Sequence, residues 1–98
     1  MMFIERIETV LPCFSDPWKL RIIAYLNCPP DLKELAETLD ARYSESLGVA
    51  MVRLGKREVN FFESGKVTIR EVSDIEEGKK LVQSILAMAA QKQFIKEQ

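Results

Sequence analysis

The second half of the chain contains three consecutive runs of strand-forming residues, and the second and third runs are amphipathic. The runs cover residues 47–54, 57–64 and 66–72 and are rich in valine and phenylalanine. Gly55-Lys56 suits a two-residue turn with glycine first, and Glu63-Ser64-Gly65 suits a three-residue loop that ends in a left-handed glycine. The pattern predicts an antiparallel β-meander.

Turn chemistry also predicts the register of this meander. A turn at Gly55-Lys56 pairs Arg53 with Glu58, Val52 with Val59, Met51 with Asn60 and Ala50 with Phe61. A three-residue loop then sets Phe61 opposite Val67 and Val59 opposite Ile69, whereas a two-residue loop would set Phe61 opposite Thr68. We expect the three-residue loop, because it keeps one face of the sheet consistently apolar.

Two helices are predicted. Asp31 can cap a short helix within residues 29–41, with Glu34 three residues later and an apolar stripe of Leu32, Leu35, Ala36 and Leu39. Ser73, with Glu76, is expected to cap a long helix that runs from Asp74 to about Lys96. Its apolar stripe consists of Gly78, Leu81, Val82, Ile85, Leu86 and Ala89.

The long helix is expected to overhang the sheet. Some 23 residues make a helix of about 35 Å, whereas a strand of seven residues spans only about 23 Å. Met88, Phe94 and Ile95 lie in or near this overhang and would be exposed apolar surface without a partner.

The N-terminal third gives weaker patterns. In residues 1–12 the spacing of Phe3, Ile4, Ile7, Val10 and Leu11 is closer to the helical period than to alternation, which favours a short helix. Residues 18–28 alternate and end in "CPP", which favours a strand. Trp18 is expected to anchor the preceding turn against the core, and "RYSES" to form a short strand or extended link.

Composition places the chain in the ordinary soluble class. Its 98 residues, 47% hydrophobic and 30% charged, suit one domain over residues 1–98. A net charge of -1 does not favour nucleic acid. No apolar run approaches the roughly 18 residues of a membrane span, and Glu5, Arg6 and Glu8 interrupt any signal peptide. We therefore expect a cytoplasmic location and no membrane contact.

The sequence has few residues for catalysis or metal binding. The chain contains no histidine, and Cys13 and Cys28 are too far apart in sequence for a Cys-x-x-Cys pair. Both are expected to be structural free thiols, although a disulfide between them stays an alternative. No paired carboxylates, glycine-rich phosphate loop or nucleophile with a base is present. We expect a non-enzymatic protein without a metal or a cofactor.

The element order, together with "FFESGKVTIREVSDIEEGKKLVQSI" at residues 61–85, resembles one repeat of the TATA-binding protein fold. The likeness covers about residues 19–86. It implies an α+β fold in which helices cover one face of an antiparallel meander sheet, and a homodimer where two repeats form a saddle. "LPCFSDPWKLRIIAYL" and "DLKELAETLDARY" also resemble the small domain that precedes the iron–sulfur module in certain corrinoid-linked proteins and proteins of anaerobes. That cysteine-rich module is absent, so no cluster is expected.

Strand parity predicts which side chains lie on the uncovered face. They are Val49, Met51, Arg53, Glu58, Asn60, Phe62, Lys66, Thr68 and Arg70, with Ile23 and Tyr25 as further candidates. Glu58 is expected to pair with Arg53 across the strands. The predicted contact set for a second copy or a protein partner is Val49, Met51, Asn60, Phe62, Thr68, Arg70, Met88, Phe94 and Ile95.

The preferred function is therefore a homodimeric interaction module that binds a protein partner. Two alternatives stay open. The first is a nucleic-acid-binding protein that uses a dimeric saddle, because Arg53, Lys66 and Arg70 lie on the open face. The second is a small-ligand site formed across the dimer.

Overall fold

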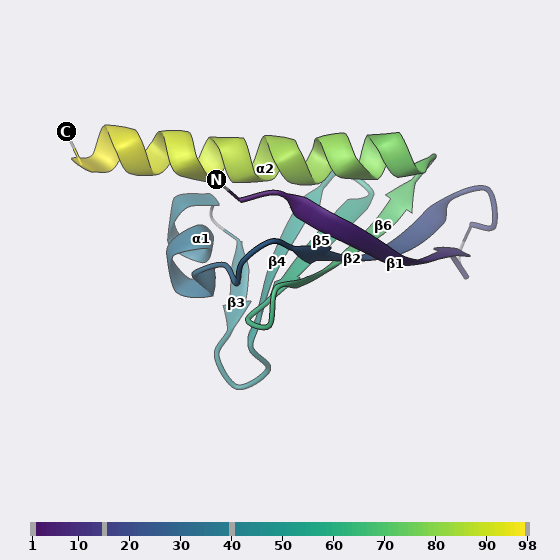
Figure 1. Ribbon diagram of the computed structural model, residues 1–98, viewed down its shortest axis with the longest axis horizontal. Coiled ribbons are helices and arrows are strands. Elements are labelled where there is room, and N and C mark those ends of the chain that lie inside the picture. Colours follow the sequence, from purple (N-terminus) through teal and green to yellow (C-terminus); the bar gives the residue numbers. More distant parts are fainter. Residues whose placement is uncertain (1, 15, 40, 98) are drawn as a thin grey trace.

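The chain forms an α+β fold in which two helices cover one face of a six-stranded antiparallel sheet (Figure 1). The computed structural model describes residues 2–14, 16–39 and 41–97, and the side chains of these except 38 and 91–97. In chain order the elements are β1 (Ile4–Pro12), β2 (Leu20–Leu26), α1 (Leu32–Leu39), β3 (Arg42–Ser44), β4 (Val49–Leu54), β5 (Arg57–Phe62), β6 (Lys66–Val72) and α2 (Ile75–Glu97).

The predicted meander is confirmed, including its register. The strands lie in the order β1-β2-β6-β5-β4-β3, so the last strand of the meander lies beside β2. Val52 pairs with Val59, Ala50 with Phe61, and Phe61 with Val67. Gly55 and Gly65 have φ values of 66° and 95°, the left-handed conformation that the two turns require.

The prediction of a helix in residues 1–12 was wrong, because this segment is the edge strand β1. Two bulges interrupt its pairing with β2, one between Ile4 and Arg6 and one between Ile7 and Thr9. Each bulge adds a residue, so Ile4, Ile7 and Val10 all turn to the helix-covered face at a spacing of three. That spacing imitates the helical period.

The core lies between the sheet and the two helices. Phe61, Ile22 and Ile85 are among its largest fully buried side chains. The predicted stripe of α2 is confirmed: Gly78, Leu81, Val82, Ile85 and Leu86 are buried and Ala89 is half-buried. The predicted stripe of α1 is confirmed for Leu32 and Leu35, which are buried in the same core.

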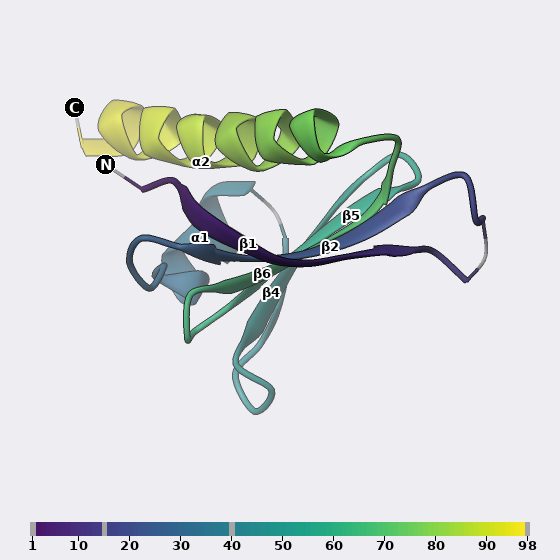
Figure 2. The same cartoon turned by 45° about the vertical axis from the view of Figure 1, so that its right-hand side comes forward.

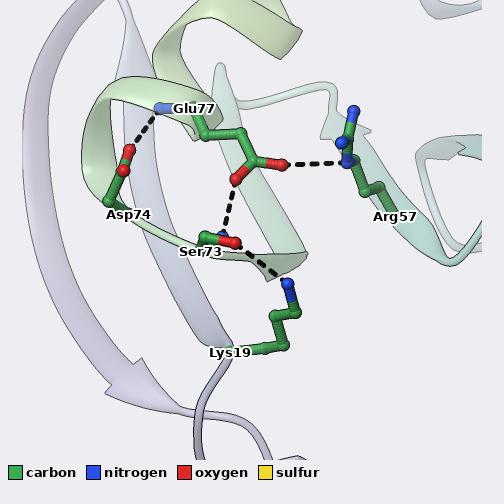
Figure 3. Close-up of polar contacts among 5 residues, drawn as sticks. All are labelled: Lys19, Arg57, Ser73, Asp74 and Glu77. Atoms are coloured by element: carbon green, nitrogen blue, oxygen red, sulfur yellow. Dashed lines mark hydrogen bonds and ion pairs between the residues drawn. The ribbon is translucent and has the colours of Figure 1, made fainter.

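Both helices begin with an aspartate cap. The Glu34 N–H donates to Oδ1 of Asp31 at 3.1 Å, as predicted for α1. At α2 the cap is displaced by one residue from the predicted Ser73 and Glu76. Oδ1 of Asp74 accepts from the Glu77 N–H at 2.7 Å, and Oε2 of Glu77 accepts from the Ser73 N–H at 2.9 Å (Figure 3).

Helix α2 is longer than the layer beneath it. Figures 1 and 2 show that its C-terminal turns continue past α1, as the sequence predicted. Among the described residues, neither helix combines the length and the apolar character needed to cross a membrane.

Candidate interaction surface

The sheet face opposite the helices is the surface that the sequence singled out, and we call it the open face. Cross-strand pairing aligns one residue from every strand in a row across it: Thr9, Ile23, Thr68, Asn60, Met51 and Arg42. Of the predicted contact residues, Val49, Met51, Asn60, Phe62, Thr68 and Arg70 lie together on this face. The alternation of side chains along each strand therefore predicted correctly that these residues share one face of the sheet.

The centre of the open face holds a polar pair. Nδ2 of Asn60 donates to Oγ1 of Thr68 at 3.0 Å. Thr68 is only 8% exposed although no helix covers it, because its neighbours on the sheet pack around it. Oδ1 of Asn60 is buried and has no hydrogen-bond partner among the described residues. An unpaired buried acceptor is unfavourable, so this amide oxygen lowers the stability of the folded chain.

Two aromatic rings on this face are each accompanied by a cation. The ammonium of Lys66 lies 5.5 Å from the ring centroid of Phe62, and the guanidinium of Arg6 lies 4.2 Å from that of Tyr25. A hydrogen bond to Glu8 is the main cause that raises the pKa of Tyr25, with smaller contributions from desolvation and from the charge of Glu8, while Arg6 lowers it. Each cation occupies one face of its ring, so that face is not free for stacking.

Three charged residues lie together on the open face, near the turn between β4 and β5. Glu58 lies 3.9 Å from Arg53 and 3.6 Å from Arg70, measured between carboxylate oxygen and guanidinium nitrogen. The predicted pair of Arg53 and Glu58 is thus present, with Arg70 as a second partner. The side chains of Arg53 and Arg70 are 76% and 45% exposed, so each pair contributes little to stability.

Positive charge is concentrated on the open face although the chain is slightly acidic. Among the described residues, the cations that register and parity place there are Arg6, Arg21, Arg42, Arg53, Lys66 and Arg70, against the carboxylates Glu8 and Glu58. The sequence had identified Arg53, Lys66 and Arg70 only. Arg6 was missed because β1 was interpreted as a helix. Since the whole chain has a net charge of -1, the other surfaces carry the excess of acid.

The remaining predicted contact residues lie on α2, away from the open face. Met88 is 41% exposed, which agrees with its expected position on an uncovered part of the helix. The side chains of Phe94 and Ile95 lie outside the described residues. The predicted set therefore divides into two separate surfaces.

The prediction that Trp18 anchors a turn against the core was wrong. Trp18 is 88% exposed and Phe14 is 100% exposed, and both lie in the connection between β1 and β2. Leu11, at the end of β1, is also exposed. The hairpin connection extends beyond the rest of the sheet, which leaves these side chains without a core to pack against (Figures 1 and 2).

A polar cluster connects the start of α2 with β5 and with the loop that precedes β2 (Figure 3). The carboxylate of Glu77 lies 2.9 Å from Nε of Arg57 on β5, and Nζ of Lys19 donates to Oγ of Ser73 at 2.9 Å. The hydrogen bond from the Ser73 N–H is the main cause that lowers the pKa of Glu77; desolvation opposes it, and the Ser73 hydroxyl and the charges of Arg57 and Lys19 add to the lowering. The cluster stabilises the helix start.

The described residues offer little for metal chemistry. Cys13 is a buried free thiol and Cys28 an exposed one. Within the described part of the chain, no three side chains from Cys, Asp or Glu gather closely enough to hold a metal ion.

Comparison of the chain with protein-family models, with curated proteins and with solved structures gives no match.

Proposed function

We propose that the chain is a non-enzymatic homodimeric interaction module that presents the open face of its sheet to a protein partner. The observation that carries this proposal is the make-up of that face, which has the hydrogen-bonded pair of Asn60 and Thr68 at its centre. Partly buried Ile23, Met51 and Phe62 surround it, and charged side chains form the rim. Partly buried apolar side chains inside a charged rim are typical of a protein interface.

The order of strands supports the proposed likeness to one TATA-binding protein repeat. From β2 onward the chain runs strand, helix, four strands and helix, and the sheet order is β2-β6-β5-β4-β3. A single repeat supplies half of a saddle, so this likeness favours a homodimer. The proposed function requires the open face and a second copy of the chain, and it does not depend on this likeness.

Site-specific photo-crosslinking tests the open face. A photoreactive phenylalanine analogue at Met51 should give one discrete protein adduct in cells, and Phe62→Asp in the same chain should abolish it. The matched control is the analogue at Ser84, an exposed position on α2. Equal adducts at both positions, or none at Met51, would reject the open face as the partner site. Sedimentation velocity at micromolar concentration tests the homodimer.

A nucleic-acid-binding function is the second candidate, and the six cations of the open face favour it. A labelled DNA duplex should then bind at low salt, with an affinity that falls steeply as salt is added. Replacing Arg42 and Lys66 with glutamine should weaken binding more than the same change at Lys79 and Lys80 on α2. Absence of binding at low salt would eliminate this function.

A further inference from the structure

Two outer rows that carry charge cross the open face on either side of a central row. The central row takes one residue from each strand: Thr9, Ile23, Thr68, Asn60, Met51 and Arg42. The first outer row, toward the turn between β5 and β6, consists of Arg6, Tyr25 and Lys66. The second, toward the turn between β4 and β5, consists of Arg21, Arg70, Glu58 and Arg53. Since Arg42 is the only charge in the central row, positive charge lies on both sides of this row and at one end of it.

The charge of the open face is only partly compensated within the chain. Among the described residues, the face has six cations and two carboxylates. One of the carboxylates, that of Glu58, is shared by Arg53 and Arg70. Arg21 and Arg42 form no ion pair with any described residue. Because uncompensated positive charge attracts acidic groups, the face is complementary to a partner of negative charge.

The arrangement of these charges favours a protein segment over nucleic acid. A nucleic-acid backbone presents phosphates at regular intervals and follows a continuous cationic groove. On the open face, Glu58 interrupts the more basic outer row, and the central row offers Ile23 and Met51, which are half-buried and apolar. A protein segment can present carboxylates to the outer rows and apolar side chains to the central row at the same time. The pattern therefore indicates an acidic segment that also carries apolar residues.

We infer that the segment bound by the open face is an acidic amphipathic helix that lies along the central row, an inference that rests on the proposed function and specifies the chemistry of the partner. Its apolar stripe, with a repeat of three or four residues, contacts Ile23 and Met51. Acidic residues on its two flanks pair with the cations of the outer rows. Attraction on both flanks holds the helix over the central row.

The spacing of the rows fits a helix. Lys66 and Arg70 lie in opposite outer rows and are four residues apart on β6, so the rows are about 13 Å apart at roughly 3.3 Å per residue. A helix with its side chains is about 10–12 Å wide, whereas an extended segment, about 5 Å wide, is too narrow to reach both rows. The six strands, about 4.8 Å apart, make the central row about 24 Å long, which corresponds to about 16 residues of helix.

A labelled helical peptide of about 16 residues tests the charge pattern directly. It has leucine along one face and glutamate on both flanks, and a matched peptide has glutamine in place of every glutamate. In fluorescence anisotropy at low salt, the glutamate peptide should bind the full chain about tenfold more tightly than the glutamine peptide, and added salt should reduce the difference.

A double variant of the chain provides the matching test on the open face. Arg21→Gln combined with Arg42→Gln removes two cations without breaking an ion pair among the described residues, and should weaken binding of the glutamate peptide by about tenfold. The control is Lys79→Gln combined with Lys80→Gln, exposed on α2, which should have little effect. Equal affinities of the two peptides, or equal effects of the two double variants, would overturn the acidic helix.

The photo-adduct at Met51 separates the acidic helix from the proposed function. The Arg21 and Arg42 substitutions should abolish the adduct in cells, and mass spectrometry should map the wild-type adduct to an acidic segment of the partner. An adduct of unchanged yield in the double variant would overturn the acidic helix and leave the protein-binding face intact. Absence of any adduct at Met51 would overturn both. A DNA duplex that binds more tightly than the glutamate peptide would also overturn both, in favour of nucleic acid.

Discussion

A Cβ atom placed on Gly78 of α2 would lie 2.9 Å from Cδ1 of Ile22 on β2. Ile22 is fully buried, and Ile69 on β6 lies next to the same point at 3.6 Å. The helix backbone therefore approaches the sheet closely at this glycine. Glycine is ordinarily unfavourable inside a helix, and here close packing explains its presence.

Gly78→Val is expected to destabilise the fold by about 1–3 kcal/mol, because the added side chain overpacks the core at Ile22. Urea denaturation followed by circular dichroism measures the free energy of unfolding. Ser84→Val is the matched control, since it introduces valine at an exposed position of the same helix. Equal effects at the two positions would show that α2 does not pack closely at Gly78.

Glu77 should make stability depend on pH in the acid range. Its pKa in the folded chain is lowered from the ordinary value of 4.5. Because the folded pKa lies below the unfolded one, the stabilisation is fully present above about pH 4.5 and is lost as the pH falls through the folded pKa.

Glu77→Gln should therefore lower stability near neutral pH, and the difference from the wild type should shrink as the solution is acidified below the ordinary carboxyl range. Urea titrations at several pH values measure this difference. Glu76→Gln is the control, since Glu76 is exposed and its ion pair with Lys79 is long, at 3.8 Å. A difference that stays constant with pH at Glu77 would contradict the assigned role.

The pair of Asn60 and Thr68 should show strong coupling in a double-mutant cycle. Thr68→Val removes the acceptor for Nδ2 of Asn60 and should cost about 1 kcal/mol, because it adds a second unpaired group to the unpaired Oδ1. Adding Asn60→Leu removes both unpaired groups, so the double variant should recover wild-type stability or exceed it. Additive losses in urea denaturation would disprove this coupling.

The meander could be predicted from sequence because its determinants are local. Gly55 and Gly65 fix the turns, and the alternation of apolar residues selects the register, so Phe61 and Phe62 were correctly assigned to opposite faces. The same alternation also predicted most of the residues that lie on the open face.

Strand β1 could not be predicted in this way. Its bulges form only in the pairing with β2, which the sequence of β1 alone does not reveal. They allow Ile4, Ile7 and Val10, which have a helix-like spacing, to face the same side of the sheet. Once β1 was taken for a helix, the connection to β2 was no longer a hairpin. The position of Arg6 on the open face was therefore missed. Trp18 was expected in the core for a different reason, namely that large aromatic side chains usually serve packing.

A third bulge leads to the last prediction. Between the pairs Leu20–Val72 and Ile22–Ile69, β6 contains one residue more than β2, and Glu71 there has a φ of 64°. Arg70 lies on the open face, and the extra residue of the bulge allows Val72 to point into the core. A left-handed backbone costs a non-glycine residue on the order of 1 kcal/mol, whereas glycine adopts it without that cost.

Glu71→Gly should therefore be more stable than Glu71→Ala by about 1 kcal/mol, since both variants lose the same side-chain interactions and differ in the left-handed backbone. Urea denaturation of the two variants measures the difference. At Arg70, which lies in ordinary extended backbone, the alanine variant should instead be more stable than the glycine variant, because glycine weakens a regular strand. If alanine is favoured at both positions, the left-handed bulge at Glu71 does not exist in solution.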